Sequence, residues 1–373
     1  MPSGKTPIKN RKPRSFAGQL LVWYDRHGRA LPWRESPKDP YHVWLSEIML
    51  QQTTVATVLA YHRRFIQRWP TIKDFANADI ADLLSAWSGL GYYRRCHLAH
   101  RCAKMVVAQG GFPRDVASLR ALPGIGAYTA PALASILYNA KAPAIDGNVQ
   151  RLVARLLAID VVPTTRARQI HDYIKARIPH ARRADFTQAL MELGGQVCRP
   201  KNPDCANCPV RHHCAAVSKN LTAHIPVKPA RKVRPDRYGV AFCCIDPAGR
   251  LLLRRRPDQG LLPGTSEVPT TPWQDKRITA RDLAATPALA QTHVPICISA
   301  QTSWQIITPP VRHIFTHFRL SLHVAITLVP RQAAPKGYHW AGGNRLHAQE
   351  PLSTLMRRVI ECGLAGTAHD AVA

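Results

Sequence analysis

The chain has 373 residues, 46% of them hydrophobic, which is enough for about two or three domains with substantial cores. No apolar run approaches the roughly 20 residues that span a bilayer. The basic segment 1–18 lacks the apolar stretch of a signal peptide, so we expect a cytoplasmic protein that does not bind membranes. The formal net charge of +28, from 51 Lys and Arg against 23 Asp and Glu, favours a polyanionic partner. A GC-rich genome, which favours arginine codons, would give part of the same excess.

In residues 16–217 apolar side chains recur at helical spacing, so this part of the chain is predicted to be all-α. Proline or glycine interrupts the pattern at 31–34, 69–70 and 110–113. The expected helices lie within residues 16–28, 43–69, 80–93, 129–140 and 149–159. Residues with a chemical role in this region therefore lie on helices or in short turns between them.

One predicted helix carries a carboxylate among apolar residues. Glu47 is flanked by Trp44, Leu45, Ile48 and Met49, and a helix that is apolar on every side is buried. Burial disfavours the ionised form and raises the pKa of a carboxyl group, as a general acid at neutral pH requires. A structural glutamate paired with a cation is the alternative.

A glycine-rich turn, Leu122-Pro123-Gly124-Ile125-Gly126, separates two helical patterns. Glycine lets the backbone approach a partner closely, and the free amides that begin the next helix can bind a phosphate without reading a base. The turn therefore fits nucleic-acid binding in a chain of this charge. Glycines chosen only for backbone freedom would give the same pattern.

A second carboxylate, Asp146, precedes the helix that begins near Val149. The free amides and the dipole of a helix N-terminus favour its anionic form, although a plain helix cap explains the residue as well. Glu47 and Asp146 are thus expected to differ in protonation state: Glu47 would keep its proton and Asp146 would keep its negative charge. Cleavage of a glycosidic bond needs an acid for the leaving group and an anion near the developing sugar cation. The pair predicts that chemistry.

Four of the ten cysteines lie close together, at Cys198, Cys205, Cys208 and Cys214. In a chain without a secretory signal, such a cluster favours metal ligation over disulfides. Only one CxxC pair is present, and six and five residues separate it from the outer cysteines. This spacing suits an iron–sulfur cluster better than a zinc ion, but spacing alone does not decide between the two metals.

Residues 223–237 are rich in proline and basic residues and are predicted to be a linker. Beyond them the pattern is that of β-structure: 238–245 and 250–254 predict a hairpin around the turn 246–249. Residues 313–328 partly alternate as a half-buried strand does, and 351–364 have helical periodicity. The C-terminal part of the chain is therefore predicted to be α+β.

These motifs resemble the adenine DNA glycosylase MutY family of the helix-hairpin-helix superfamily, which also contains endonuclease III. The matching segments are LPWR (31–34), YHVWLSEIMLQQTTVATV (41–58), SGLGYYRR (88–95), LPGIGAYTA (122–130), AIDGNV (144–149) and the cysteine run 198–214. The resemblance implies a nucleoid-associated, monomeric enzyme with one [4Fe–4S] cluster on the four cysteines. It would hydrolyse the N-glycosidic bond of adenine opposite 8-oxoguanine or guanine in double-stranded DNA. A mismatch-specific thymine glycosylase and a DNA-binding protein without catalysis are the alternatives.

The resemblance also implies roles for the residues around the two carboxylates. Glu47 would protonate the adenine, and Asp146 would stabilise the sugar cation or bond to it. Tyr128 and Asn148 would orient these carboxylates. Endonuclease III-like lyases carry a nucleophilic lysine at the position of Tyr128, and some members of the MutY family have lysine where this chain has Gln150. Their absence implies a monofunctional glycosylase without strong strand cleavage.

Further residues are implied to contact DNA or the lesion. Gln52 and Tyr92 would wedge into the base stack while the adenine is extruded. The remaining residues implied to bind DNA are Arg34, Leu122, Gly124 and Gly126.

The C-terminal part resembles the MutT-like domain with which the family recognises 8-oxoguanine. Phe315-Thr316-His317 stands where the family usually has Phe-Ser-His, so a hydroxyl group is retained with an added methyl. The segment 260–264 is followed by Glu267 alone instead of a cluster of glutamates, whereas a Nudix hydrolase needs several carboxylates to hold divalent ions. This domain is therefore predicted to recognise the lesion and not to be a second enzyme.

The expected architecture is multidomain. Residues 1–222 would form an all-α helix-hairpin-helix glycosylase with a [4Fe–4S] cluster loop, and 238–366 an α+β MutT/Nudix-like domain. Within the first region, the N-terminal helix and 143–217 would form the iron–sulfur subdomain and about 32–142 the helix-hairpin-helix subdomain. The basic linker over 223–237 and a tail over 367–373 complete the chain.

Overall fold

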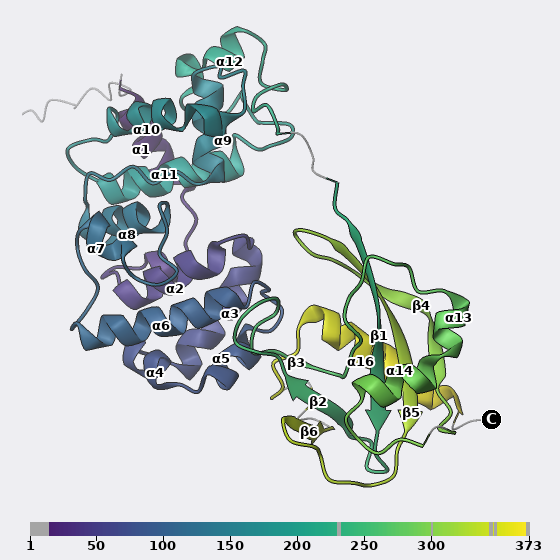
Figure 1. Ribbon diagram of the computed structural model, residues 1–373. Helices are drawn as coiled ribbons and strands as arrows, with labels where there is room; N and C mark the ends of the chain where they lie inside the picture. Colours follow the sequence, from purple (N-terminus) through teal and green to yellow (C-terminus); the bar gives the residue numbers. More distant parts are fainter. Residues whose placement is uncertain (1–14, 230–232, 300, 343–345, 347–348, 371–373) are drawn as a thin grey trace, which may run out of the picture. The chain divides into compact units, whose positions relative to one another are not determined.

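The computed structural model describes residues 15–229, 233–299, 301–342, 346 and 349–370 (Figure 1). It forms two compact units, Met1–Ile66 with Arg101–Ala230 and Gln67–His100 with Arg231–Ala373. Residues 1–14, 230–232 of the predicted linker and 371–373 of the predicted tail lie outside the described residues. No helix in the described ranges is both long and apolar enough to cross a membrane.

The N-terminal part of the chain is all-α, as predicted. Its helices, in chain order, are α1 (Phe16–His27), η1 (Pro32–Arg34), α2 (Pro40–Leu50), α3 (Val55–Arg68), α4 (Ile72–Asn77), α5 (Ile80–Trp87), α6 (Arg94–Ala108), α7 (Val116–Arg120), α8 (Thr129–Tyr138), α9 (Gly147–Leu156), η2 (Pro163–Arg166), α10 (Ala167–Lys175), α11 (Arg183–Gln196), η3 (Arg211–His213) and α12 (Ala215–Ser218). The predicted helix 43–69 is two helices, α2 and α3, because the chain turns at Gln51–Thr54 with Gln52 at a φ of +63°.

The start of α2 shows how local sequence places Glu47. The Asp39 side chain caps the helix by accepting hydrogen bonds from the amides of Tyr41 (2.7 Å) and His42 (3.4 Å), and Pro40 occupies the first turn. From Val43 to Met49 every residue of α2 is buried. The prediction that this helix is apolar and buried is therefore confirmed.

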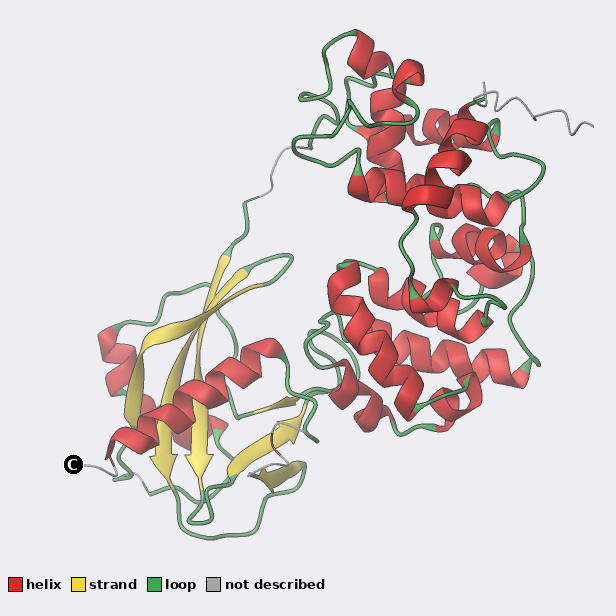
Figure 2. Ribbon diagram, turned by 180° about the vertical axis from the view of Figure 1, so that it is seen from behind, coloured by secondary structure: helices red, strands yellow, loops and turns green. Residues whose placement is uncertain are grey.

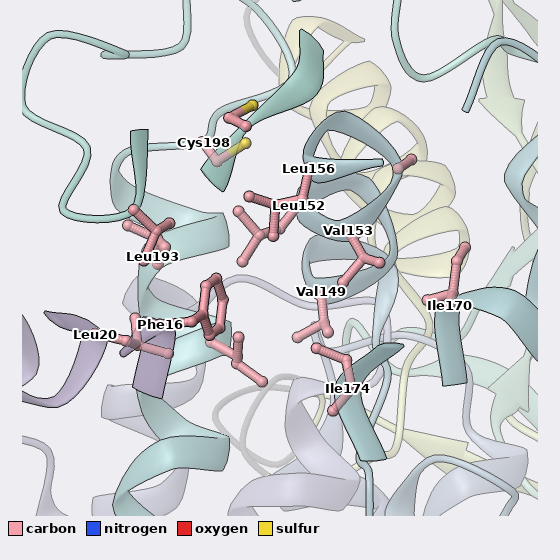
Figure 3. Packing of buried hydrophobic residues seen from close by; sticks show 14 of the residues in the cluster. Phe16, Leu20, Val149, Leu152, Val153, Leu156, Ile170, Ile174, Leu193 and Cys198 are labelled. Carbon is pink, nitrogen blue, oxygen red and sulfur yellow. The ribbon is translucent and has the colours of Figure 1, made fainter. Parts of the chain in front are cut away.

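The first unit has a hydrophobic core that joins elements distant in sequence (Figure 3). Phe16 and Leu20 of α1 pack among the apolar side chains of α9, α10 and α11, and Phe16 meets the ring of Phe186 edge-on at 6.4 Å. Cys198, the first residue of the cysteine run, lies at the edge of the same core. The cysteine loop thus rests on the helix that Asp146 caps.

The C-terminal part of the second unit is built on one mixed sheet (Figure 2). Its strands are β1 (Asp236–Ile245), β2 (Leu251–Arg255), β3 (Ser266–Glu267), β4 (Gln305–Ile314), β5 (Arg319–Leu328) and β6 (Tyr338–Ala341). The order is β3-β2-β1-β5-β4, with β6 also paired to β2; β1 and β5 are parallel, and the other pairs among the described strands are antiparallel. The predicted hairpin is β1 and β2, with Ile245 opposite Leu251.

Helices cover both faces of this sheet. The last helix, α16 (Thr354–Asp370), crosses one face (Figure 2), and its Val359 belongs to the same hydrophobic cluster as the β1 residues Ala241 and Cys243. On the other face Ala290 of α14 (Thr286–His293) packs against Phe242. The short helix α13 (Ala280–Ala284) precedes α14. The prediction of a multidomain chain with an all-α region and an α+β domain is therefore confirmed.

The prediction of a single strand over 313–328 was wrong. The segment spans the end of β4, a turn and β5, and the turn is closed by a hydrogen bond from the Phe315 amide to the Phe318 carbonyl (2.9 Å). Phe315 and Phe318 stack at 4.6 Å, so both rings stay on one side of the turn. The apolar and polar residues of this segment alternate only in part because it contains the end of one strand and the whole of the next.

Candidate functional site

A cavity of about 910 Å³ in the first unit contains the predicted catalytic residues. It is formed by residues of η1, α2, the turn after α2, α3, α8, α9 and α11, and by residues that directly precede η1, α8 and α9. Its lining includes Arg29, Trp33, Arg34, Glu47, Gln52, Tyr128, Asp146, Asn148, Met191 and Gln196. The cavity has the volume of a ligand site.

Glu47 lies in this cavity with little access to solvent, at 6% exposure. The Tyr128 hydroxyl donates a hydrogen bond to its Oε2 at 3.0 Å. Burial raises the pKa of Glu47 to about 7; the Tyr128 hydrogen bond opposes this rise, and the negative charge of Asp146 adds to it. Burial also raises the pKa of Tyr128 well above its usual range, so the phenol keeps its proton and remains a donor. Glu47 can therefore hold a proton near neutral pH.

Asp146 caps α9, as its position predicted. Its Oδ1 accepts from the Val149 amide at 2.7 Å, and its Oδ2 accepts from Asn148 Nδ2 at 2.9 Å. Asn148 is held in turn by Arg151, whose Nη2 donates to Asn148 Oδ1 at 2.8 Å. Both carboxylate oxygens of Asp146 therefore accept hydrogen bonds, which favours the negative charge. Asp146 can cap the helix and also act as an anion in catalysis.

Arg151 also reaches the cysteine loop. Its Nη2 donates to the Gly194 carbonyl at 2.6 Å, and its Nε donates to the Cys198 carbonyl at 2.9 Å. A Cβ added to Gly194 would lie 2.8 Å from Asn148 Cβ and 2.9 Å from its carbonyl oxygen. The position of Asn148 thus depends on close packing between α9 and α11.

A buried glutamate that the sequence analysis missed, Glu192, holds two arginines at the cavity. Its carboxylate accepts from Arg29 Nε at 2.8 Å and pairs with Arg34 Nη1 at 2.7 Å, and Gln196 also donates to it. Burial opposes ionisation of Glu192, but these contacts outweigh it and lower the pKa. Arg34, predicted to bind DNA, is thus placed in the cavity wall. The apolar neighbours Leu190, Met191 and Leu193 were a signal of the kind that identified Glu47.

The glycine-rich turn links α7 to α8. Leu122 is 4% exposed and anchors the turn in the core, whereas Gly126 is exposed and Gly124 has a φ of +77°. Gln51 Nε2 donates to the Gly124 carbonyl at 3.4 Å and to Thr129 Oγ1 at 3.2 Å. Any phosphate contact of this turn would therefore come from its exposed glycine backbone, and that role stays a prediction.

The four cysteines predicted to bind a cluster line one small apolar cavity with Leu152, Leu156 and Val217. Arg155 donates from Nη1 to the Cys198 sulfur at 3.3 Å. Burial raises the pKa of the other three thiols, to about 12 for Cys208. Within the described ranges, no group of three or more His, Cys, Asp or Glu side chains is arranged to hold a single metal ion.

In the second unit the predicted wedge residue Tyr92 lies in the turn between α5 and α6. It is 46% exposed and has a φ of +49°, which is unusual for a residue with a side chain. Gln52, the other predicted wedge residue, is likewise exposed at positive φ in the first unit. Two residues held in this conformation with exposed side chains are consistent with a role in binding.

The predicted lesion-recognition residues lie at the β4–β5 turn. Thr316 and His317 are exposed, while Phe315 packs on Phe318 and lies 5.8 Å from the ring of Trp273. Phe315 therefore fixes the turn, and the next two side chains are available to a partner.

Glu267 of β3 is not available to a metal ion. It is 1% exposed, and its two carboxylate oxygens accept hydrogen bonds from Arg254 (2.9 Å) and Arg256. Both arginines would have to be displaced before this carboxylate could bind a cation.

Comparison with known proteins identifies relatives of both parts of the chain. Residues 45–174 match the model of the HhH-GPD superfamily base excision DNA repair protein, and 240–362 match that of the NUDIX domain. The chain is 33% identical over 411 residues to the adenine DNA glycosylase of Mus musculus, covering 92% of this chain and 77% of the mouse protein. It is 37% identical over 357 residues to that of Arabidopsis thaliana, covering 83% of this chain and 56% of the plant protein. A solved thermostable thymine-DNA glycosylase aligns with a TM-score of 0.50 at 23% identity, over 55% of this chain and 95% of that one, which shows the fold alone.

Proposed function

Because this chain belongs to the adenine DNA glycosylase family, a group of DNA N-glycosylases, we propose that it removes adenine paired with 8-oxoguanine or guanine from double-stranded DNA. We place this activity in the cytoplasm, with the enzyme acting as a monomer. One observation supports the proposal above all others: Glu47 and Asp146 line a single cavity, each with its own hydrogen-bonding partner. Such a pair can assist both halves of glycosidic bond cleavage.

Glu47 is the proton donor in this mechanism. With a pKa of about 7 it retains its proton on a large fraction of molecules at neutral pH. An adenine extruded from the duplex would enter the cavity and receive this proton on ring nitrogen 7, which turns the base into a better leaving group. Tyr128 orients the carboxyl group through its hydrogen bond. Its phenol stays protonated and neutral, so it remains a donor when Glu47 loses its proton.

Asp146 stabilises the sugar. As the base departs, positive charge develops on the deoxyribose, and an anion beside it lowers the energy of that state. Asn148 and the Val149 amide hold the carboxylate in place. Water then completes the hydrolysis and leaves an abasic site. Since position 128 is tyrosine and position 150 glutamine, no amine of the expected kind is present to cleave the strand.

Arg29 and Arg34 bring donors to the same cavity. Glu192 holds both guanidinium groups, so they are fixed before the substrate arrives. Fixed donors favour a base with hydrogen-bond acceptors on its ring, as adenine has, and they also favour the negative phosphates of an extruded nucleotide. Arg34 thus contributes to substrate binding from within the cavity.

The four cysteines fit a [4Fe–4S] cluster. All four border one apolar cavity, and the Arg155 guanidinium beside Cys198 would stabilise a thiolate there. When bound, the cluster would cross-link the loop 198–214. Arg155 would support that loop through its bond to the Arg199 carbonyl (2.7 Å) and would tie it to the Ile225 carbonyl (2.8 Å). Arg151, which is bonded to the Cys198 carbonyl, connects the loop to Asn148.

The C-terminal domain would recognise the base opposite the adenine. 8-Oxoguanine differs from guanine by a carbonyl oxygen and a proton on ring nitrogen 7, and a hydroxyl or backbone group at Thr316 can distinguish these. The turn that carries Thr316 is held by the stacked rings of Phe315 and Phe318. The paired arginines on Glu267 argue that this domain binds and does not hydrolyse.

The proposal is tested by single-turnover excision on three duplexes, with adenine opposite 8-oxoguanine, adenine opposite guanine and thymine opposite guanine. We expect excision of adenine from the first two, faster from the first, and none of thymine. Thymine release would instead indicate a thymine glycosylase, and binding without release an inactive DNA-binding protein. Salt must be held constant, because a chain of net charge +28 binds all DNA more tightly as salt falls.

The cofactor has a test of its own. We expect protein purified without oxygen to contain iron and sulfide in similar amounts. Zinc without iron would show that the four cysteines hold a different metal.

A further inference from the structure

The turn that carries Tyr92 has an unusual backbone. Gly89 and Gly91 have φ values of +99° and +72°, and Tyr92 follows at +49°. A residue with a side chain is strained there and keeps this conformation only where its surroundings impose it. The strained residue is also an exposed aromatic on a highly basic chain, which is a combination suited to stacking on a nucleic-acid base.

Part of the constraint comes from the adjacent helices. Arg95 Nη2 donates to the carbonyls of Leu90 (3.3 Å) and Gly91 (3.4 Å), and the Trp87 indole donates to Gly91 at 3.1 Å. The Arg95 guanidinium also lies 5.3 Å from the centre of the Tyr92 ring. These contacts hold the C-terminal half of the turn.

The other part comes from the C-terminal domain, which belongs to the same compact unit. The Leu352 carbonyl accepts from Ser88 Oγ at 2.5 Å and from the Tyr93 hydroxyl at 3.2 Å. Arg357 of α16 donates to the same Ser88 Oγ from Nε (3.2 Å) and Nη2 (3.1 Å). Ser88, Tyr93 and Leu352 are all buried. The residues on both sides of Gly89–Tyr92 are thus bonded to a segment more than 250 positions later in the chain.

A second contact supports this docking. His97 Nε2 lies 3.3 Å from the Pro263 carbonyl, and a Cβ added to Gly264 would come within 2.8 Å of Leu84 Cδ1 and 3.0 Å of His97 Nε2. The loop before β3 therefore packs closely on both α5 and α6. Contact at two places fixes the α5–α6 turn against this domain.

We infer that the C-terminal domain positions Tyr92, so that recognition of the opposite base by this domain and insertion of Tyr92 into the duplex are coupled. Ser88 and Arg357 are the positioning residues, and they act through the backbone of the turn. This inference rests on the proposed function, and it adds a mechanical role for the C-terminal domain to its proposed recognition of the lesion.

The experiment measures binding without catalysis. The duplex carries 8-oxoguanine opposite a stable abasic analogue, with 2-aminopurine beside the lesion to report unstacking by its fluorescence. Arg357→Ala and Ser88→Ala should each weaken binding about threefold to tenfold and reduce the fluorescence rise. In a Tyr92→Ala background, neither change should weaken binding further, because the residue through which they act is gone. Equal losses in both backgrounds would overturn the inference.

Two matched variants separate positioning from general effects. Arg358→Ala removes the same charge from the neighbouring position of α16, where the side chain is exposed and donates to the Arg312 carbonyl, and should leave binding and fluorescence unchanged. Arg357→Lys retains a donor for Ser88 and should recover part of the loss. If Arg358→Ala equals Arg357→Ala, the effect is one of charge and the inference is wrong. Adenine excision by the wild-type chain is assayed separately, so a failure of the proposed function can be distinguished from a failure of this inference.

Discussion

Two buried glutamates in different parts of the molecule have opposite surroundings. Glu47 in the helical region and Glu267 in the C-terminal domain are 6% and 1% exposed. Glu47 faces a cavity and accepts a hydrogen bond from the neutral Tyr128 hydroxyl. Burial raises its pKa to about 7. Glu267 is bound by two arginines. The comparison teaches that burial favours the protonated form of a carboxyl group most where no cation is paired directly with it.

Glu192 shows the same contrast inside the first unit. It is fully buried within the same region as Glu47, but Arg29 and Arg34 neutralise it. All three carboxyl groups are buried, and their partners distinguish them: Glu47 accepts a hydrogen bond from the Tyr128 hydroxyl, whereas Glu192 and Glu267 are each bound by two arginines.

The largest expected effect comes from removing the proton at Glu47. Glu47→Gln should lower the single-turnover rate of adenine excision by about 10²–10⁴-fold, with the Kd for the duplex nearly unchanged, because the proton is needed only in the transition state. The matched change Glu267→Gln should leave the rate close to wild type and lower Tm, since two arginines lose their carboxylate. If Glu47→Gln keeps the wild-type rate, another group is the acid.

Asp146→Asn should match Glu47→Gln in size for a different reason. It removes the charge beside the sugar and keeps the shape of the α9 cap, so DNA binding and Tm should persist while excision nearly stops. The measurement is again single-turnover excision beside a titration of duplex binding. A rate above a tenth of wild type, on the order of 1.4 kcal/mol of barrier, would assign Asp146 to capping alone.

A change that leaves both carboxylates in place comes next. Gly194→Ala places a Cβ against the backbone of Asn148 and should shift the start of α9. We expect excision to fall by about 10–100-fold, since a displacement of about 1 Å at a catalytic group costs that much, and unfolding free energy to fall by about 1–3 kcal/mol. Unaltered kinetics in the folded variant would show that the helices adjust without moving Asp146.

The pH profile tests Glu47 directly. In the proposed mechanism the protonated carboxyl is the active form, so single-turnover excision should be high below pH 7 and decline above it. Tyr128→Phe removes a hydrogen bond that favours the ionised carboxylate, which raises the pKa of Glu47 and moves the decline to higher pH. The shift is measured by comparing the two profiles on one duplex. A decline at lower pH in Tyr128→Phe would contradict this assignment.

The last expected effect concerns substrate preference and lies in the C-terminal domain. Thr316→Ser should preserve or slightly improve the preference for 8-oxoguanine over guanine, because the hydroxyl remains and the β-branch that restricts its rotamer is removed. The double change Thr316→Ala, His317→Ala should reduce that preference by about 1–3 kcal/mol. Rates and affinities on both duplexes at one salt concentration provide the check. An unchanged preference in the double variant would place lesion recognition elsewhere.

Some features were determined by the sequence itself because they depend on neighbours in the chain. The apolar residues around Glu47 predicted its burial, and the position of Asp146 before a helix predicted its cap. The β1–β2 hairpin followed from a turn between two apolar runs. The spacing of the four cysteines indicated a metal-binding loop, and the motifs of the helical region indicated the family.

Other features were decided only by the tertiary structure, because they join residues that no local pattern connects. Arg29 meets Glu192 across 163 positions, and Ser88 meets the Leu352 carbonyl across 264. The turn at Phe315–Phe318 contains no glycine or proline, so the sequence predicts a continuous strand there. The stacking of the two aromatic rings, which forms only in the folded chain, accompanies the turn. Periodicity reports which face of an element is apolar, whereas the partner of a buried charge depends on which elements fold together.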